Sequence, residues 1–316
     1  MADLIRRRIA GRTTTALVGA LIAAGLLAGC AATPAGEAGG TAAPGADGGT
    51  AVASTTLRIA TSDDSEFQDA IKEVAAEDGL TVEWVNLDDW VLPNTQVVDG
   101  TVDGNAFQHI LFLSQFNTQN NATLTPVFST VITQWGVFSA KYASLQDIPD
   151  GSAIAIPDDP SNRGRAIFIL EAAGLIELND GVGNFPTTED IAENPHGFSF
   201  TEIAAKTIPQ QFDDPSLGAV VVGTSYFDPS QGITSDSALY LDDSTSTHNL
   251  PYVNVVATTQ EKAKDGAWAI LEQAYADPRV AEALLEENGG ATVLVHVPVD
   301  ELRSKLAELE TEAAAG

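Results

Sequence analysis

Strand-like and helix-like patterns alternate along most of this chain, and this alternation restricts its fold more than any other feature. Residues 55–60 (TTLRIA) have the residue types of a strand. Ser65 and Gln68 then have the spacing of a capping box, before a helical apolar face that stops near Gly79. Residues 81–87 (TVEWVNL) alternate like a second strand. This β-α-β beginning predicts an α/β fold with largely parallel sheets.

The same alternation continues toward the C-terminus and divides into two blocks. Strands are predicted at 152–156, 218–223 and 251–258. Helices are predicted from Pro93, from about Ala106 to Phe116, from near Gly164 to Ala173, and at 261–276 and 278–287. We therefore predict two lobes, in which residues 57–135 and 259–316 form the first and residues 136–258 form the second.

The N-terminal region has the features of an export signal. Four arginines in residues 1–12 precede a short apolar run that ends at Cys30. Residues 27–30 (LAGC) resemble the bacterial lipobox, which implies that residues 1–29 are a signal peptide and that Cys30 carries a lipid. An uncleaved membrane anchor with an incidental cysteine is the alternative. Residues 30–56 are rich in Gly, Ala, Pro and Thr, and we predict a flexible tether there.

Charge and cysteine content exclude several classes of protein. The formal net charge is −29, which argues against nucleic-acid binding because phosphates require Lys and Arg patches. It also argues against a surface that lies on anionic lipid. Cys30 is the only cysteine, so no disulfide can form within the chain.

Motifs for metal, nucleotide or nucleophilic chemistry are not found in the sequence. The four histidines lack metal-ligand spacing, and there is no P-loop, no G-x-G-x-x-G after a strand and no G-x-S-x-G. We therefore predict no catalytic residue, no metal and no cofactor, and we favour a binding protein over an enzyme.

His109 lies in an apolar stretch, NAFQHILFL, and its role decides between an enzyme and a binder. A lone histidine in such a run can be a core residue, a metal ligand, a catalytic base or part of a ligand pocket. Trp90, Phe107 and Phe112 flank it, and such a cluster is more often core than pocket. The residues alone leave these alternatives open.

A second candidate site lies in IPDDPSNRGRAIF, where a strand, a turn and a helix start follow one another. Free N–H groups at a helix N-terminus attract an anion, and Arg165 in the first turn adds a fork for a carboxylate. Asn162 can cap the helix or hold the ligand. For Arg163 we prefer pairing with surrounding acids, and that alternative also remains open for Arg165.

Long motifs in the chain resemble the NlpA-type, methionine-binding lipoproteins of ABC importers. These are DDWVLPN…DGNAFQH, then GSAIAIPDDPSNRGRAIF, and PYVN near Asn254. The resemblance implies a two-lobed periplasmic-binding-protein fold of type II-like form, with a ligand cleft between the lobes. It implies that Trp90, Phe107, His109 and Phe112 surround a thioether side chain. It also implies that Arg165, Asn162 and Asn254 contact the head group.

The chain departs from the family pattern at the head-group end. The family usually has an asparagine where this chain has Val222 or Gly223, and Trp135 is a bulky residue where the family has a smaller one. Trp90 and Phe112 replace family tyrosines. Because lost hydrogen-bond partners change the preference among polar ligands, another amino acid, a short peptide or a small carboxylate is an alternative to methionine.

The resemblance also implies the partners and the location. We expect a monomer held at the extracytoplasmic face of the cell membrane by the lipid on Cys30. It would deliver an amino acid to a permease with its ATPase. An exported hydrolase or an adhesin is the rival class.

Overall fold

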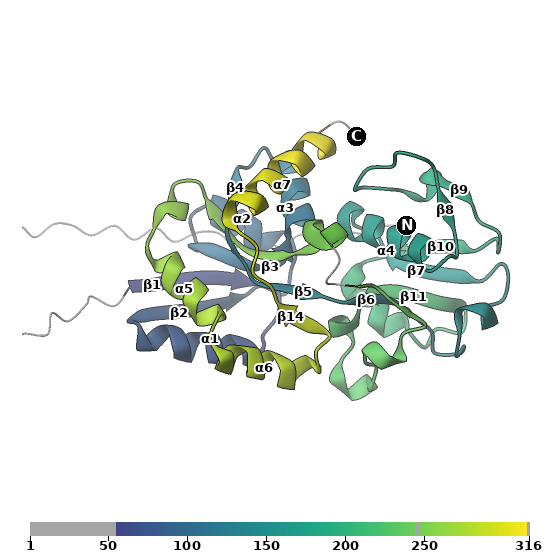
Figure 1. The fold of residues 1–316 in the computed structure, drawn as a ribbon, viewed down its shortest axis with the longest axis horizontal. Coiled ribbons are helices and arrows are strands. Elements are labelled where there is room, and N and C mark those ends of the chain that lie inside the picture. The colour runs from purple at the N-terminus through teal and green to yellow at the C-terminus, as the bar shows by residue number, and fades with distance from the viewer. Residues whose placement is uncertain (1–54, 244–246, 315–316) are drawn as a thin grey trace, which may run out of the picture. The chain divides into compact units, whose positions relative to one another are not determined.

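The computed structural model describes residues 55–243 and 247–314 (Figure 1). The predicted signal peptide, Cys30 and residues 31–54 of the tether lie outside the described residues. Thr55 and Thr56, which we predicted as the end of the tether, already belong to the first strand. Residues 51–316 form one compact unit.

The first sheet has five strands in the order β2-β1-β3-β13-β4. Their bounds are Thr55–Thr61 for β1, Leu80–Asn86 for β2, Gly104–His109 for β3, Leu124–Ser129 for β4 and Asn254–Thr259 for β13. Strand β1 is parallel to β2 and β3, whereas β13 is antiparallel to both β3 and β4. The sheet is therefore mixed, and the prediction of largely parallel sheets was only half right.

Helices cover both faces of the first sheet (Figure 1). One group consists of α1 (Glu66–Glu77), α5 (Ala267–Tyr275) and α6 (Pro278–Asn288). The other consists of α2 (Leu92–Val98), α3 (Ile110–Asn120) and α7 (Val299–Ala313). Each group closes its own apolar core against the sheet, so this lobe has three layers.

The second sheet has the order β10-β7-β11-β6-β12. Its strands are Trp135–Phe138 for β6, Ala153–Pro157 for β7, Ser199–Ile203 for β10, Leu217–Gly223 for β11 and Tyr240–Leu241 for β12. Strand β7 is parallel to both neighbours, and β6 is antiparallel to β11 and β12. Helix α4 (Pro160–Ala172) and the 3₁₀ helix η3 (Ala205–Gln211) contribute to two separate cores of this lobe. A small hairpin of β8 (Glu177–Leu178) and β9 (Ile191–Glu193) lies apart from the sheet.

The chain crosses between the two sheets twice. It leaves the first sheet through β5 (Val131–Thr133), which pairs with β14 (Thr292–Leu294) and leads directly into β6 (Figure 1). It returns through the 3₁₀ segment η7 (Thr247–Tyr252) into β13. Our predicted boundary at residue 258 put β13 in the second lobe, but strand pairing favours a return before Asn254.

Two helix predictions need correction. The helix expected from Ala106 begins only at Ile110, because residues 104–109 pair as strand β3 with the distant β13. Helix α4 begins at Pro160 rather than near Gly164. Its N-cap is Asp159, whose carboxylate accepts a hydrogen bond from the Asn162 N–H at 2.9 Å. Of the two roles that we left open for Asn162, capping of this helix is therefore excluded.

Candidate functional site

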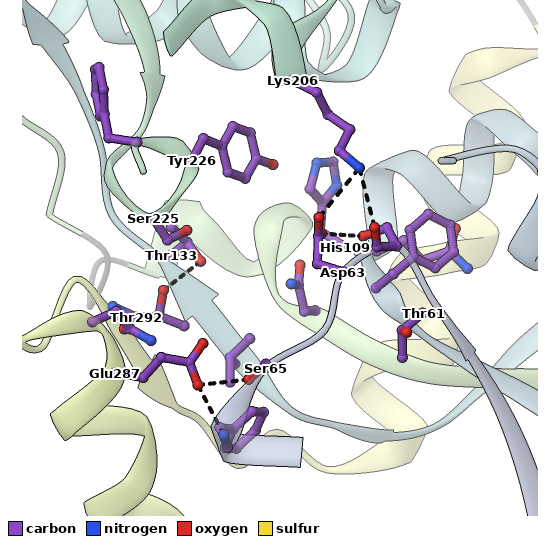
Figure 2. Close-up of a pocket in the computed structure, with 18 of the residues that line it drawn as sticks. Thr61, Asp63, Ser65, His109, Thr133, Lys206, Ser225, Tyr226, Glu287 and Thr292 are labelled. Atoms are coloured by element: carbon purple, nitrogen blue, oxygen red, sulfur yellow. Dashed lines mark hydrogen bonds and ion pairs between the residues drawn. The ribbon is translucent and has the colours of Figure 1, made fainter. Parts of the chain in front are cut away.

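A cavity of about 720 Å³ lies between the two lobes, and side chains from both line it (Figure 2). Its volume falls in the range of small-molecule sites. The structure brings all seven predicted ligand-binding residues to this one cavity, namely Trp90, Phe107, His109, Phe112, Asn162, Arg165 and Asn254. The sequence placed these residues in four separate segments, and the fold joins them.

Aromatic rings form one wall of the cavity. Phe112 makes edge-to-face contacts with Trp90 and Phe107, at centroid distances of 6.2 and 6.0 Å. Tyr226, from the second lobe, lies 5.7 Å from both Trp90 and Trp135. The aromatic cluster is therefore a cavity wall rather than sealed core, and it extends from one lobe to the other. The sequence had not singled out Tyr226.

His109 ends β3 and acts as the N-cap of α3. Its Nδ1 accepts a hydrogen bond from the Phe112 N–H at 3.1 Å, and its Nε2 lies 3.0 Å from Oδ1 of Asn162 in the other lobe. Because Nδ1 accepts, we assign the ring proton to Nε2, which then donates to Asn162. Both nitrogens have partners within the chain, so His109 has none left for a ligand or for proton transfer.

The charge state of His109 agrees with this structural role. Only 7% of the residue is exposed, and burial lowers the pKa of the imidazole to about 4. The nearby Arg165 also lowers this pKa, whereas the bond to Asn162 opposes the shift. His109 is therefore neutral at physiological pH and joins the two lobes through a neutral hydrogen bond.

The amide of Asn162 is also fully used within the chain. Its Nδ2 donates to both carboxylate oxygens of Asp159 at 3.1 Å, while its Oδ1 faces His109. Asp159 is buried enough that its pKa is raised. In this arrangement Asn162 orients its neighbours, and its amide offers no free group to a ligand.

Arg165 is the cationic group of the cavity, and 2% of it is exposed. Its Nη2 donates to the Thr133 carbonyl at 2.8 Å and to Oδ2 of Asp242 at 3.0 Å. The guanidinium also lies over the rings of Tyr252 and Trp135, at 4.5 and 4.9 Å. These contacts hold Arg165 in place and leave Nη1 for a ligand. Nε is buried without a partner.

The two arginines of α4 have different roles. Arg163 pairs with Glu202 at 2.9 Å near the surface, as we predicted for it. Arg165 also has an acidic partner, Asp242, although its side chain faces the cavity. For Arg165 we had left open pairing with an acidic residue and binding of a ligand carboxylate. Both are compatible with the structure, because Nη2 is paired with Asp242 and Nη1 has no partner among the described residues.

Asn254 is the first residue of β13, and its side-chain amide lines the cavity. Among the described residues nothing hydrogen-bonds to this amide. It can therefore donate and accept, as the head group of an amino acid requires. It is the one predicted head-group residue whose polar side chain remains fully available.

Three motif residues in the first lobe hold the wall in position. Asn94, Asn105 and Gln108 are buried, and four hydrogen bonds of 2.6–2.8 Å join their side-chain amides. They connect α2 to β3 and so fix the segments that carry Trp90 and Phe107. Sequence reasoning missed this network because only the fold shows that the three amides meet.

Lys206 in η3 reaches across the mouth of the cavity to the first lobe (Figure 2). Its Nζ lies 2.6 Å from Oδ1 of Asp88, 3.3 Å from Oδ1 of Asp63 and 3.2 Å from the Ser62 carbonyl. Partial burial lowers the pKa of Lys206, but the carboxylates of Asp88 and Asp63 outweigh it and raise this pKa, so the side chain is charged. No local pattern indicates this contact, because the partners are more than one hundred residues apart.

Within residues 55–243 and 247–314, no His, Cys, Asp and Glu side chains gather in a way that could hold a metal ion. No helix in the same part of the chain combines the length and apolar character needed to cross a membrane. The polar groups that the cavity offers to a small molecule are therefore hydrogen-bonding groups, such as Nη1 of Arg165 and the amide of Asn254.

Known proteins have the same sequence pattern and the same fold. The model of the NlpA lipoprotein family matches residues 56–295. The D-methionine-binding lipoprotein MetQ of Salmonella typhimurium is 35% identical over 230 residues, which are 72% of this chain and 83% of that protein.

Similar solved structures include two proteins that bind methionine or belong to a methionine transporter. A nutrient-binding protein from Burkholderia cenocepacia, bound to methionine, is 32% identical with a TM-score of 0.69, over 75% of this chain and 99% of that one. The substrate-binding protein of a methionine transporter from Streptococcus pneumoniae is 28% identical with a TM-score of 0.69, over 76% and 95%. The two-lobed fold is thus that of periplasmic binding proteins, as predicted, and the chain belongs to the NlpA lipoprotein family.

Proposed function

We propose that this chain is the lipid-anchored, extracytoplasmic solute-binding protein of an ABC importer, and that it binds methionine or a closely related amino acid. The observation that carries the proposal is the cavity itself. It combines an arginine and a free asparagine amide with an aromatic wall. A small amino acid with an apolar side chain matches this division into a polar and an apolar part.

The arrangement of the lobes supports a binding role. The residues that line the cavity come from both lobes, and within the described residues the chain crosses between the sheets twice, so a hinge motion could open and close the cavity. The closed form would be recognised by a permease with its ATPase. We further propose that the lipid on Cys30 keeps a monomeric protein at the outer face of the cell membrane.

The roles of the site residues follow from their free groups. Nη1 of Arg165 and the amide of Asn254 would hold the carboxylate and the amino group. Trp90, Phe107 and Phe112 would contact the side chain. His109 and Asn162 would keep these residues in position. A different amino acid, a short peptide or a small carboxylate remains the alternative ligand, because the chain lacks the family asparagine and the family tyrosine hydroxyls at Trp90 and Phe112.

Two measurements on the purified full chain test this proposal. Native mass spectrometry of freshly purified protein would reveal a co-purified solute by its mass. A thermal-shift panel of L- and D-amino acids should then give its largest shift with methionine, since a ligand that binds only the folded state stabilises it. A large shift with another amino acid and none with methionine would correct the ligand.

The same panel separates the rival classes. A chain that shows no shift with any amino acid, dipeptide or small carboxylate would overturn the proposed binding role and favour an adhesin. Turnover of a bound ester or peptide would favour a hydrolase instead.

A further inference from the structure

Within the part of the chain that the structure describes, the indole nitrogen of Trp135 lacks a hydrogen-bond partner, unlike those of the buried Trp268 and the partly buried Trp84. Nε1 of Trp84 donates to the Gln68 carbonyl at 2.9 Å, and Nε1 of Trp268 donates to the Lys262 carbonyl at 2.7 Å. Trp135 is only 1% exposed, yet its Nε1 has no hydrogen-bond partner among the described residues. A buried indole N–H normally finds a partner, so this one lacks the acceptor it needs.

The free N–H of Trp135 belongs to the cavity. Trp135 lines it, and its Nε1 is not among the fully buried polar atoms that lack a partner, so it keeps access to the interior. The ring also contacts the guanidinium of Arg165 at 4.9 Å. The unpaired donor is therefore close to the cationic group.

The chain itself uses several of the donors near Arg165. Nη2 of Arg165 is paired with Thr133 and Asp242, and both nitrogens of His109 are also engaged. A carboxylate placed against Nη1 would need a second donor to satisfy its other oxygen. The indole N–H of Trp135 is one nearby donor without a partner in the described part of the chain, in addition to the amide of Asn254.

Gly223 provides the space for this indole. Strand β11 pairs Gly223 with Trp135, and a Cβ at position 223 would lie 2.8 Å from Nε1 and 3.3 Å from Cδ1. The backbone of Gly223 has φ −66° and ψ 136°, which any residue can adopt. Position 223 therefore requires glycine because a side chain there would collide with the indole of Trp135. Val222, the other candidate for the missing family asparagine, is buried in the core of the second lobe.

We propose that Trp135 is a ligand-contacting, specificity-determining residue, whose indole N–H donates a second hydrogen bond to the ligand carboxylate held by Arg165. Gly223 is its steric partner. This inference rests on the proposed function, because it requires that the cavity holds a small carboxylate. It favours solutes that present an oxygen acceptor at this point over solutes that present an ammonium group.

An NMR experiment tests the contact itself, with L-methionine or the amino acid of largest thermal shift as the probe. The ¹⁵N-labelled chain should show four indole N–H signals, and the signal lost in Trp135→Phe is that of Trp135. Saturating probe should move this signal, while those of Trp84 and Trp268 stay in place. A Trp135 signal that does not move while the probe binds would overturn the inference and leave the proposed function intact.

Affinities provide the second test. Because a hydrogen bond to a charged group is lost, Trp135→Phe should weaken the affinity for the probe by roughly ten- to one-hundred-fold. Trp268→Phe, the matched control, also removes an indole N–H, but outside the cavity, and should bind like the parent chain. Equal affinities for these two variants would overturn the inference. A parent chain that binds no amino acid would overturn both the inference and the proposed function.

The steric pair can be tested by a double-mutant cycle. Gly223→Ala should displace the indole and weaken binding by itself. When Gly223→Ala is combined with Trp135→Phe, it should reduce the affinity much less, because Phe lacks the Nε1 atom that the new Cβ would meet. Strictly additive losses would contradict the pairing of Trp135 with Gly223.

Discussion

At the level of single residues, the family resemblance implied seven of the side chains that line the cavity but not what each one does. His109 was expected at the polar edge of a ligand pocket, and it does line the cavity. Its two nitrogens, however, are used by Phe112 and Asn162. Asn162 is 53 positions away and in the other lobe, so no local pattern could have shown this pairing.

His109 gives a prediction for the pH dependence of stability. Its pKa falls from the ordinary value of 6.5 to about 4 on folding, so the unfolded chain binds the extra proton between these values. The free energy of unfolding should therefore fall as the pH drops from about 6.5 to about 4. At pH 4.5 this one residue should remove about 2–3 kcal/mol relative to pH 7.5.

The measurement is urea unfolding of the parent chain and of His109→Gln at both pH values. Carboxylates titrate in both proteins, so the difference between the two isolates the histidine. The parent chain should lose about 2–3 kcal/mol more than the variant on acidification. Parallel losses would mean that the imidazole is not held neutral in the folded protein.

At the level of secondary-structure elements, local patterns predicted what short-range physics controls. The strands at residues 55–61 and 217–223 and the helix opened by Asp277-Pro278 were all found close to their predicted positions. The failures have a common cause in tertiary contacts. Residues 104–109 pair with the distant β13, and this pairing overrides their helix-like apolar spacing. The hydroxyl of Ser65 donates to Glu287 rather than capping α1.

The contact between η3 and the first lobe leads to a prediction on ligand affinity. Lys206 joins Asp63 and Asp88 across the mouth of the cavity, and we expect it to favour the closed arrangement. Lys206→Met should weaken solute binding by a few-fold, since these pairs are partly exposed to solvent. The difference in solute affinity between the parent chain and Lys206→Met should become smaller as the NaCl concentration rises from about 0.05 M to about 0.5 M.

Lys264→Met is the matched control, because Lys264 is exposed and does not line the cavity. It removes the same charge and should leave the affinity unchanged at either salt concentration. If the two lysine variants behaved alike, the contact of Lys206 with the first lobe would have no part in closure.

At the level of the whole molecule, the alternation of strands and helices predicted an α/β protein with two lobes, and the motif resemblance implied the periplasmic-binding-protein fold. The assignment of each strand to a sheet could not be read from the sequence. Strand β13 follows the second lobe in sequence but completes the first sheet between β3 and β4. Such long-range pairing places Asn254 beside the cavity, a location that the resemblance at PYVN implied but that no strand or helix pattern indicates.

Calorimetric titration of L-methionine into the full chain tests whether this cavity binds an amino acid through Arg165. We predict saturable one-to-one binding by the parent chain and by Arg163→Ala, whose arginine pairs with Glu202 outside the cavity. We predict no measurable binding by Arg165→Ala, with its fold checked by circular dichroism. Binding by Arg165→Ala as tight as that by Arg163→Ala would refute the carboxylate site that we assign to Arg165.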